Sequence, residues 1–268
     1  MTSEQIATAL MDALDRTILI EPLTARYSDF TEAAAYDVGA EILQRRRMRG
    51  EQPVGRKVGF TNRTIWAEYG VHAPIWAHVY DSTVTLLDHP LGSVDVSRLA
   101  QPRIEPEIVL HFRKAPAGAR EEAEILDCVD WIAHGFEIVQ SHFPDWRFKP
   151  ADTVAAFGLH GALIVGPKKP VSEVPNLINA LRTFEISLAR NGEIQATGGG
   201  FNVLDSPLLA ASHFLTLLDG QHAFQPVTAG ELVTTGTLTA ALPVVAGETW
   251  STRLSGLGLP DLTLEIRS

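Results

Sequence analysis

Residues 103–110 read Arg-Ile-Glu-Pro-Glu-Ile-Val-Leu, an apolar β-type run interrupted by two acids. On a strand, residues two apart point to the same face, so Glu105 and Glu107 are expected to project together while the flanking isoleucines face the opposite side. Pro106 lies between the acids and cannot donate a ladder hydrogen bond. It therefore predicts an edge position, or a bulge that opens onto a cleft.

The acids of this run indicate a cation site. Two carboxylates a few ångströms apart on an apolar strand repel each other, and a hard divalent cation is the simplest group to offset that repulsion. Glu137 lies in a second β-type run, residues 134–140, where a buried charge also needs a partner. Three carboxylates leave octahedral positions for water and a chelating substrate, which suits Mg²⁺ or Mn²⁺. On residue types alone, acids on an edge strand that face water explain the pattern equally well.

Outward from this run, the chain divides into a helical N-terminal part and a β-rich remainder. Apolar stripes at helical spacing predict helices over about residues 3–16, 31–47, 122–131 and 207–218. Short apolar runs between Gly, Pro and Asp predict strands at residues 55–61, 84–87, 104–112, 136–140, 161–166 and 184–190, and three or four more within 231–266. The sequence contains no internal repeat and no linker. Residues 1–268 are expected to form one α+β domain, with 1–50 as a helical segment and 51–268 as the catalytic core.

Composition narrows the class of protein. The 268 residues are 45% hydrophobic and 20% charged, which is ordinary for a globular protein. The formal charge of −10 argues against nucleic acid as a partner. No apolar run approaches the roughly 20 residues that cross a bilayer, and the start of the chain has no signal-peptide pattern. The lack of such a run predicts no membrane partner. The single cysteine, Cys128, rules out an intramolecular disulfide and fits a reducing environment, so we expect a cytoplasmic protein.

Several short motifs follow one another along the chain. They are Lys57-Val-Gly-Phe-Thr61, Glu105-Pro-Glu107, Phe136-Glu137-Ile-Val139, Thr235-Gly-Thr-Leu-Thr239 and the run from Pro243 to Gly247. Each motif is weak alone, but their order and spacing match over nearly the whole chain from the second expected helix onward. In these motifs the chain resembles the 2-hydroxypenta-2,4-dienoate (2-keto-4-pentenoate) hydratase and 4-oxalocrotonate decarboxylase branch of the fumarylacetoacetate hydrolase superfamily.

The resemblance implies a fold, an assembly and a site. The fold of this superfamily is a mixed β-roll with peripheral helices, and its members commonly form homo-oligomers. Glu105, Glu107 and Glu137 are implied as the metal ligands. Lys57 is implied as the active-site lysine, and Asp81 is implied to lie near the substrate.

Some positions depart from the pattern of the family in segments that are expected to line the substrate pocket. Gln140 stands where relatives commonly have Asp, and Phe157 and His160 replace small polar residues. Thr237, within the C-terminal motif, is expected in the same pocket. The departures imply an altered substrate shape or chemistry. For His160, a proton carrier or substrate contact and a hydrogen-bonded structural histidine are equally good interpretations.

The implied function is that of a metal-dependent lyase for a small 2-oxo or 2-hydroxydienoic acid. Metal chelation by a 2-oxo acid stabilises the enolate that hydration and decarboxylation share, and a metal-lowered pKa suits Lys57 for acid–base work at neutral pH. The alternative is hydrolysis of the C–C bond of an acylpyruvate, which needs a water-activating base. His72 and His78 lie in the loop expected over residues 70–82, and either histidine with the nearby Glu68 has suitable chemistry, but the spacing assigns neither. A non-catalytic 2-oxo-acid-binding protein is the third alternative.

Overall fold

The structure, a computed structural model, describes residues 2–268 apart from the side chains of Ile65, Glu68 and Tyr69. The α-helices are α1 (Ser3–Arg16), α2 (Leu23–Arg26), α3 (Glu32–Met48), α4 (Trp66–Tyr69), α5 (Glu122–Leu126), α6 (Pro150–Ala155), α7 (Leu177–Thr183) and α8 (Pro207–Asp219). Single 3-10 turns are η1 (Arg63–Ile65), η2 (Pro144–Trp146), η3 (Phe157–Leu159), η4 (Val171–Glu173) and η5 (Gly200–Asn202).

The strands fall into two sheets. The larger sheet has the order β2-β1-β11-β5-β6-β7-β3, with β12 and β8 paired to β5 and β6 outside this path. Its strands are β1 (Pro53–Gly59), β2 (Ile75–Tyr80), β3 (Val84–Leu86), β5 (Arg103–Phe112), β6 (Val129–Val139), β7 (His160–Val165), β8 (Lys169–Pro170), β11 (Leu232–Thr234) and β12 (Leu242–Pro243). The smaller sheet, in the order β10-β9-β13-β14-β4, consists of β4 (Leu91–Asp95), β9 (Glu185–Arg190), β10 (Glu193–Gly199), β13 (Thr249–Ser255) and β14 (Thr263–Arg267).

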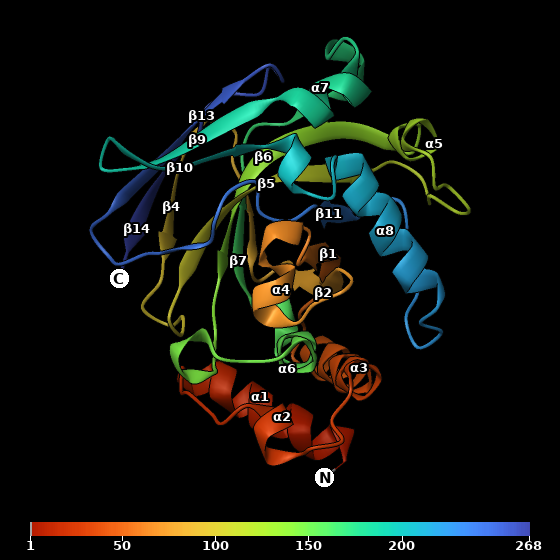
Figure 1. Cartoon of the computed structure of the whole chain (residues 1–268), viewed down its shortest axis with the longest axis vertical. Helices are drawn as coiled ribbons and strands as arrows, with labels where there is room; N and C mark the ends of the chain where they lie inside the picture. Colours follow the sequence, from red (N-terminus) through yellow and green to blue (C-terminus); the bar gives the residue numbers. More distant parts are fainter. Residues whose placement is uncertain (1) are drawn as a thin grey trace.

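The N-terminal helices gather with α6 at one end of the molecule (Figure 1). A capping box between Thr2 and Gln5 begins α1, and the side chain of Thr31 caps α3. Apolar side chains of α1 and α3, among them Leu10 and Val38, pack in one buried cluster with α6. The larger sheet curls above this end, and side chains of β5, β6, β7 and β11 form a small apolar cluster on its inner face. This mixed sheet with peripheral helices is the α+β roll that was expected.

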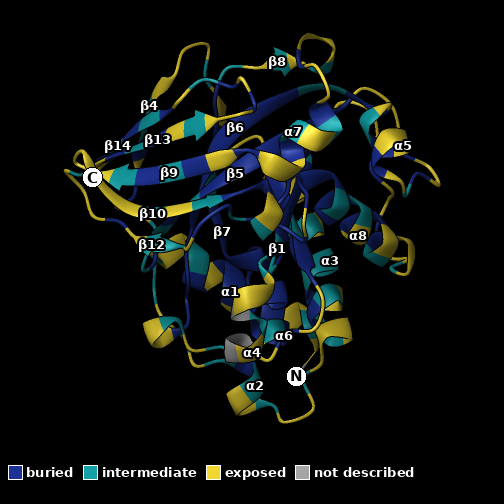
Figure 2. Cartoon of the chain, turned by 45° about the horizontal axis from the view of Figure 1, so that its top comes forward, coloured by how far each residue is buried: buried dark blue, intermediate teal, exposed yellow. Residues whose placement is uncertain are grey.

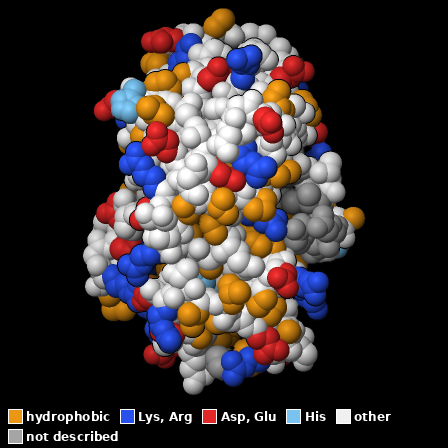
Figure 3. Space-filling model, turned by 90° about the vertical axis from the view of Figure 1, so that its left-hand side faces the viewer, with side chains coloured by type: hydrophobic (Ala, Val, Ile, Leu, Met, Phe, Trp, Pro, Cys, Tyr) orange, Lys and Arg blue, Asp and Glu red, His pale blue; other side chains and the backbone are white. Residues whose placement is uncertain are grey.

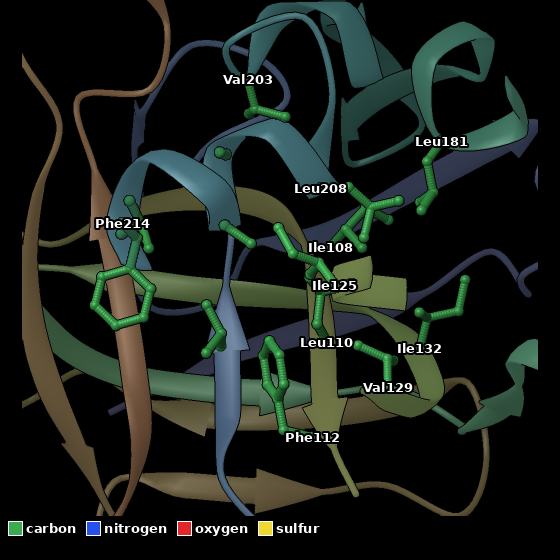
Figure 4. Close-up of a cluster of buried hydrophobic side chains, with 14 of the residues drawn as sticks. Ile108, Leu110, Phe112, Ile125, Val129, Ile132, Leu181, Val203, Leu208 and Phe214 are labelled. Carbon is green, nitrogen blue, oxygen red and sulfur yellow. The ribbon is translucent and has the colours of Figure 1, made fainter. Parts of the chain in front are cut away.

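Alternate residues of β5 face different layers. Ile104 packs between the two sheets together with Trp250 of β13. Ile108 and the next residues on its side of the strand pack against α5, α7 and α8, as Figure 4 shows. The central strands β5, β6 and β7 are accordingly buried, whereas β10 at the edge of the smaller sheet is largely exposed (Figure 2). The two glutamates of β5 occupy the intervening positions and face the inside of the curl.

The helix expected over residues 122–131 is wrong beyond its first half. Helix α5 ends at Leu126, and Val129 already begins β6. Trp131 lies opposite His111 of β5 on one side and Pro170 of β8 on the other. Long-range pairing thus overrides the helical periodicity of this segment.

The edge position expected for Pro106 is also wrong. Strand β5 has β6 on one side and both β11 and β12 on the other. Its irregular pairing with β6 lies at His111 rather than at the proline. The proline is tolerated because it falls in the interval between β11 and β12, where its carbonyl accepts a hydrogen bond from the amide of Leu238 outside the ladder.

Helix α8 and the turn before it form an apolar segment. Within the described residues, Gly200–Asp219 is long and apolar enough to cross a membrane by length and composition, and 56% of it is buried inside the protein. A core helix of a globular protein has the same properties. Leu208 and Phe214 of α8 belong to the core cluster drawn in Figure 4.

Candidate metal centre

Three carboxylates meet on the inner face of β5 and β6. The antiparallel register places Glu105 directly opposite Glu137, with Glu107 one pair further along the same face. One oxygen of each carboxylate lies within 4.8 Å of the others. Glu107 and Glu137 are fully buried, and Glu105 is partly exposed. The shared face of the two β5 glutamates, expected from the strand period, is thus present and is joined by Glu137.

Backbone and side-chain donors hold these carboxylates. The amide of Gly236 donates to Glu107 Oε2 over 2.8 Å. Gly236 has φ of +96°, and a Cβ there would lie 1.8 Å from Thr61 Oγ1, so only glycine brings its amide this close. The other oxygen of Glu107, Oε1, is buried and has no hydrogen-bond partner among the described residues.

Lys57 reaches the cluster from β1. Its Nζ lies 3.2 Å from Glu137 Oε2 and donates to the carbonyl of Gly158 over 2.9 Å. Gly158 has φ of +58°, between Phe157 and Leu159, which also adopt positive φ. Left-handed backbone costs about 1–2 kcal/mol at a non-glycine residue, so the fold maintains a strained turn where a carbonyl fixes the buried lysine.

Burial and neighbouring charges shift the pKa values of the ionisable groups in different directions. Burial raises the pKa of Glu105 to about 7, and it raises the pKa of Glu107 well above the usual range. Burial acts on Glu137 in the same direction, but Lys57 and the hydrogen bond from His160 outweigh it and lower the pKa of Glu137 to about 2. Burial opposes the charge of Lys57, yet the three carboxylates raise its pKa. A lowered pKa was expected for Lys57 from the sequence. That lowering requires the positive charge of a bound metal ion beside the lysine.

This donor set fits a hard divalent cation. Carboxylate oxygens are the ligands that Mg²⁺, Mn²⁺ and Ca²⁺ prefer. Native proteins rarely leave a buried oxygen such as Glu107 Oε1 without a partner. A cation between the three carboxylates would satisfy that oxygen and offset the repulsion that a single lysine leaves uncompensated.

A cavity opens beside the carboxylates. Its lining combines the polar groups of the centre with apolar and aromatic walls, and includes Lys57, Glu105, Thr237, Arg103, Phe60, Ile75, Val139, Trp146, Phe148 and Leu159. Thr237, which was expected in the substrate pocket, lines this cavity. Arg103, two residues before Glu105 on the same face, was missed, although the strand period that paired Glu105 with Glu107 already indicated it.

The other expected pocket residues lie elsewhere. Gln140 is buried away from this cavity, where Oε1 accepts from the amide of Ala100 over 3.1 Å and Nε2 donates to the carbonyl of His160 over 3.2 Å. Phe157 lines a separate cavity on the side of α3 and α6. His160 is buried with Nδ1 2.8 Å from Glu137 Oε1, so it touches a candidate metal ligand rather than the cavity.

The structure does not bring Asp81 to the centre. Its carboxylate accepts from the amide of Gln52 over 2.9 Å at the far end of the β1–β2 pair. There it lines a surface groove with His111 and Trp131, which share a face of β5 and β6 with the glutamates but lie at the opposite end of the roll. We assign Asp81 no role at the metal.

Within the segment expected as a loop over residues 70–82, residues 75–80 form strand β2. His78 pairs with Arg56 across the sheet and packs against Trp76, on the face opposite Lys57. His72 is exposed, and the side chain of Glu68 lies outside the described residues. In the part of this segment that the structure describes, no histidine reaches the carboxylates.

Comparisons with known proteins identify the family of the chain. The family described as fumarylacetoacetate (FAA) hydrolase C-terminal matches residues 69–263. The chain is 32% identical to 4-oxalocrotonate decarboxylase of Pseudomonas sp. (strain CF600), over 95% of this chain and 92% of that protein. It is 30% identical to 2-hydroxyhexa-2,4-dienoate hydratase of Comamonas testosteroni, over 93% of this chain and 92% of the relative.

A solved structure extends the similarity to three dimensions. The 4-oxalocrotonate decarboxylase from Pseudomonas putida G7, complexed with magnesium and adipate, superposes with a TM-score of 0.89 and 28% identity over 98% of this chain and 97% of that chain. The resemblance expected from the motifs is therefore confirmed. The chain belongs to the fumarylacetoacetate hydrolase family and, within it, to the branch of the 2-keto-4-pentenoate hydratases and 4-oxalocrotonate decarboxylases.

Proposed function

We propose that this protein is a divalent-metal-dependent lyase that hydrates or decarboxylates a small 2-oxo or 2-hydroxydienoic acid. Glu105, Glu107 and Glu137 hold Mg²⁺ or Mn²⁺, and Lys57 is the acid–base group. The observation that carries the proposal is the buried carboxylate cluster with the Nζ of Lys57 3.2 Å from one of its oxygens, beside a cavity with polar and apolar walls.

The groups around the cavity have separate roles in the proposed reaction. A divalent ion at the three glutamates supplies Lewis-acid polarisation of the 2-oxo group. Lys57, held by Glu137 and the Gly158 carbonyl, moves a proton at the carbon chain of the substrate, next to its 2-oxo group. The aromatic rings of the lining, Trp146 among them, exclude water and leave the polar groups in a low-dielectric pocket.

The hydrolytic alternative needs a base that activates water. Among the described histidines, His160 alone contacts a metal-centre carboxylate, and both of its ring nitrogens already have partners, in Glu137 and Thr83. The lyase route needs only a proton-transferring lysine. The burial of Lys57 also argues against a non-catalytic binding protein. A buried ammonium group destabilises the fold, and such a group is expected where it serves a reaction.

We also propose how the protein works in the cell. The chain acts as one catalytic domain of a homo-oligomer in the cytoplasm, without a nucleic-acid or membrane partner. The formal charge of −10 supports the exclusion of nucleic acid. On the face drawn in Figure 3, acidic and basic side chains are interspersed, so that face presents no extended basic field.

The function is tested with the Mg²⁺- or Mn²⁺-loaded protein and a panel of 2-hydroxydienoates, oxalo-dienoates and acylpyruvates, with products identified by mass. A gain of one water is expected for hydration, or a loss of one carbon dioxide for decarboxylation. Chelation should abolish turnover, and metal should restore it. Cleavage of an acylpyruvate into two fragments, or turnover that survives complete removal of the metal, would contradict the lyase proposal.

Arg103 provides a second test of the substrate class. Its guanidinium lies 4.0 Å above the ring of Trp146, lines the cavity, and makes no ion pair with a carboxylate of the described residues. We propose that it binds a substrate carboxylate. Arg103→Met keeps an unbranched side chain that can pack on the Trp146 ring but loses the guanidinium and its charge. KM should therefore rise about 10- to 100-fold, as expected for a charge-assisted hydrogen bond, with a smaller change in kcat.

The matched control is Arg113→Met, at an exposed arginine paired with Asp127. It should leave both kinetic constants unchanged. Equal KM values for the Arg103 variant and the parent would remove Arg103 from the substrate site.

A further inference from the structure

His160 stands between a metal-centre carboxylate and a hydroxyl. It begins β7, is 3% exposed, and has Nδ1 2.8 Å from Glu137 Oε1. Its Nε2 lies 2.9 Å from Oγ1 of Thr83, in the turn between β2 and β3. Thr83 is tied to β7 in turn, because its carbonyl accepts from the amide of Leu163 over 2.8 Å. The ring therefore has a partner at each nitrogen and a fixed orientation.

Hydrogen-bond chemistry decides which groups donate. A carboxylate only accepts, so Nδ1 carries a proton and donates to Glu137. In the neutral ring Nε2 accepts from the hydroxyl of Thr83, which also lies 3.1 Å from the carbonyl of Tyr80. In the charged ring Nε2 donates to the Thr83 oxygen, and the hydroxyl proton goes to that carbonyl. In both states His160 gives a hydrogen bond to Glu137 Oε1 and has no nitrogen left for a metal or a substrate.

The hydrogen bond from His160 makes the two oxygens of Glu137 different. Oε1 is engaged by His160, and Oε2 is the oxygen that faces Lys57 at 3.2 Å. We propose that His160, oriented by Thr83, is a positioning residue that leaves Glu137 one free oxygen for the metal and the lysine. This inference rests on the proposed metal site.

The backbone around His160 supports the same assignment. Residues 157–159, all with positive φ, form the strained turn whose central carbonyl holds Lys57, and His160 follows directly. The carbonyl of His160 accepts from Nε2 of Gln140, which is itself buried. One short segment thus positions both the lysine and the third carboxylate. Of the two interpretations of His160 that the sequence left open, this proposal favours the hydrogen-bonded structural histidine and adds a role in orienting a metal ligand.

The experiment measures Mn²⁺ affinity by isothermal titration calorimetry on the whole protein. His160→Leu removes the donor, and Mn²⁺ affinity should fall about 10- to 100-fold, the usual effect of losing a group that orients a ligand. His160→Asn places an amide N–H where Nδ1 was, so it should recover most of that loss. Thr83→Val keeps the branched shape without the hydroxyl and should weaken binding in the same direction by less than His160→Leu.

The matched control is His142→Leu. His142 is also buried, and its Nδ1 is hydrogen-bonded to the carbonyl of Ile18 over 3.0 Å, outside the metal centre. The control removes a comparable contact and should leave Mn²⁺ affinity at the parent value. Circular dichroism of each variant establishes that it is folded, and Thr83→Val together with His160→Asn decides the matter should the leucine variant not fold.

The outcomes separate the inference from the function on which it rests. A parent protein that binds no Mn²⁺ would overturn the metal-dependent function. A parent that binds Mn²⁺, with variants of His160 and Thr83 that bind it equally well, would overturn the positioning role alone. Equal losses in the leucine and asparagine variants would do the same, because the asparagine retains the donor.

Discussion

The Glu107→Gln variant is expected to lose roughly three orders of magnitude in kcat/KM, the rate equivalent of about 4 kcal/mol of transition-state stabilisation by a metal. The substitution keeps the shape of the side chain and an oxygen that can accept from the amide of Gly236. It removes one of three negative charges that face each other in a fully buried position. A divalent cation depends on those charges for its affinity.

The same change should stabilise the metal-free protein. Oε1 of Glu107 has no hydrogen-bond partner among the described residues, and burial already raises the pKa of this carboxyl well above its usual range. A neutral amide therefore removes the free-energy cost of protonating this carboxyl, or of keeping it charged, beside Glu105 and Glu137. We expect a higher Tm for the metal-free variant than for the metal-free parent, and a smaller gain in Tm on adding Mn²⁺.

Steady-state kinetics, calorimetric Mn²⁺ titration and thermal melts with and without metal measure these effects. Glu173→Gln, at an exposed glutamate away from the centre, is the matched control and should change none of them. Parent-like turnover and Mn²⁺ stoichiometry in the Glu107 variant would show that the carboxylates do not form the metal site.

The part of the site that could be predicted from sequence follows from local geometry. The period of two along a strand puts Glu105 and Glu107 on one face whatever their surroundings, and the structure bears this out. Arg103 follows from the same rule and was overlooked. The remaining contacts join residues far apart in the chain, such as Glu105 with Glu137 across the sheet and His160 with Thr83. Without a known register, no local pattern specifies them.

The errors have the same origin. Asp81 follows the apolar strand β2, but the antiparallel pairing of β2 with β1 carries it to the end of the roll away from the carboxylates. Val129 continues a helical pattern and nevertheless begins β6, because β5 provides a pairing partner. Pro106 suggested a sheet edge and instead occupies an interval between two partner strands. In each case the position or secondary structure of the residue depends on the strand that pairs with it, and the local sequence does not identify that strand.

Lys57→Met is expected to lower kcat by about 100- to 10,000-fold, the range that general acid–base groups contribute, while Mn²⁺ still binds. Methionine has a similar reach and no charge, so the cavity keeps its shape. The ammonium of Lys57 lies 3.2 Å from Glu137 Oε2, and its charge offsets the carboxylates of the centre. Its removal should destabilise the metal-free protein, and bound metal should restore much of the loss. The rise in Tm on adding Mn²⁺ should therefore be larger in this variant than in the parent, the reverse of the Glu107 variant.

Lys169→Met is the matched control for the lysine. Lys169 also donates its Nζ to a glycine carbonyl, that of Gly258 over 2.7 Å, but it lies outside the carboxylate centre. Its loss should leave kcat and the Mn²⁺-dependent change in Tm at parent values. The opposite responses expected of the Glu107 and Lys57 variants separate the two roles, because one removes a metal ligand and the other removes a competing cation. Unchanged turnover in Lys57→Met would exclude Lys57 as the proton-transfer group, whereas lost turnover together with lost Mn²⁺ binding would reduce its role to support of the metal site.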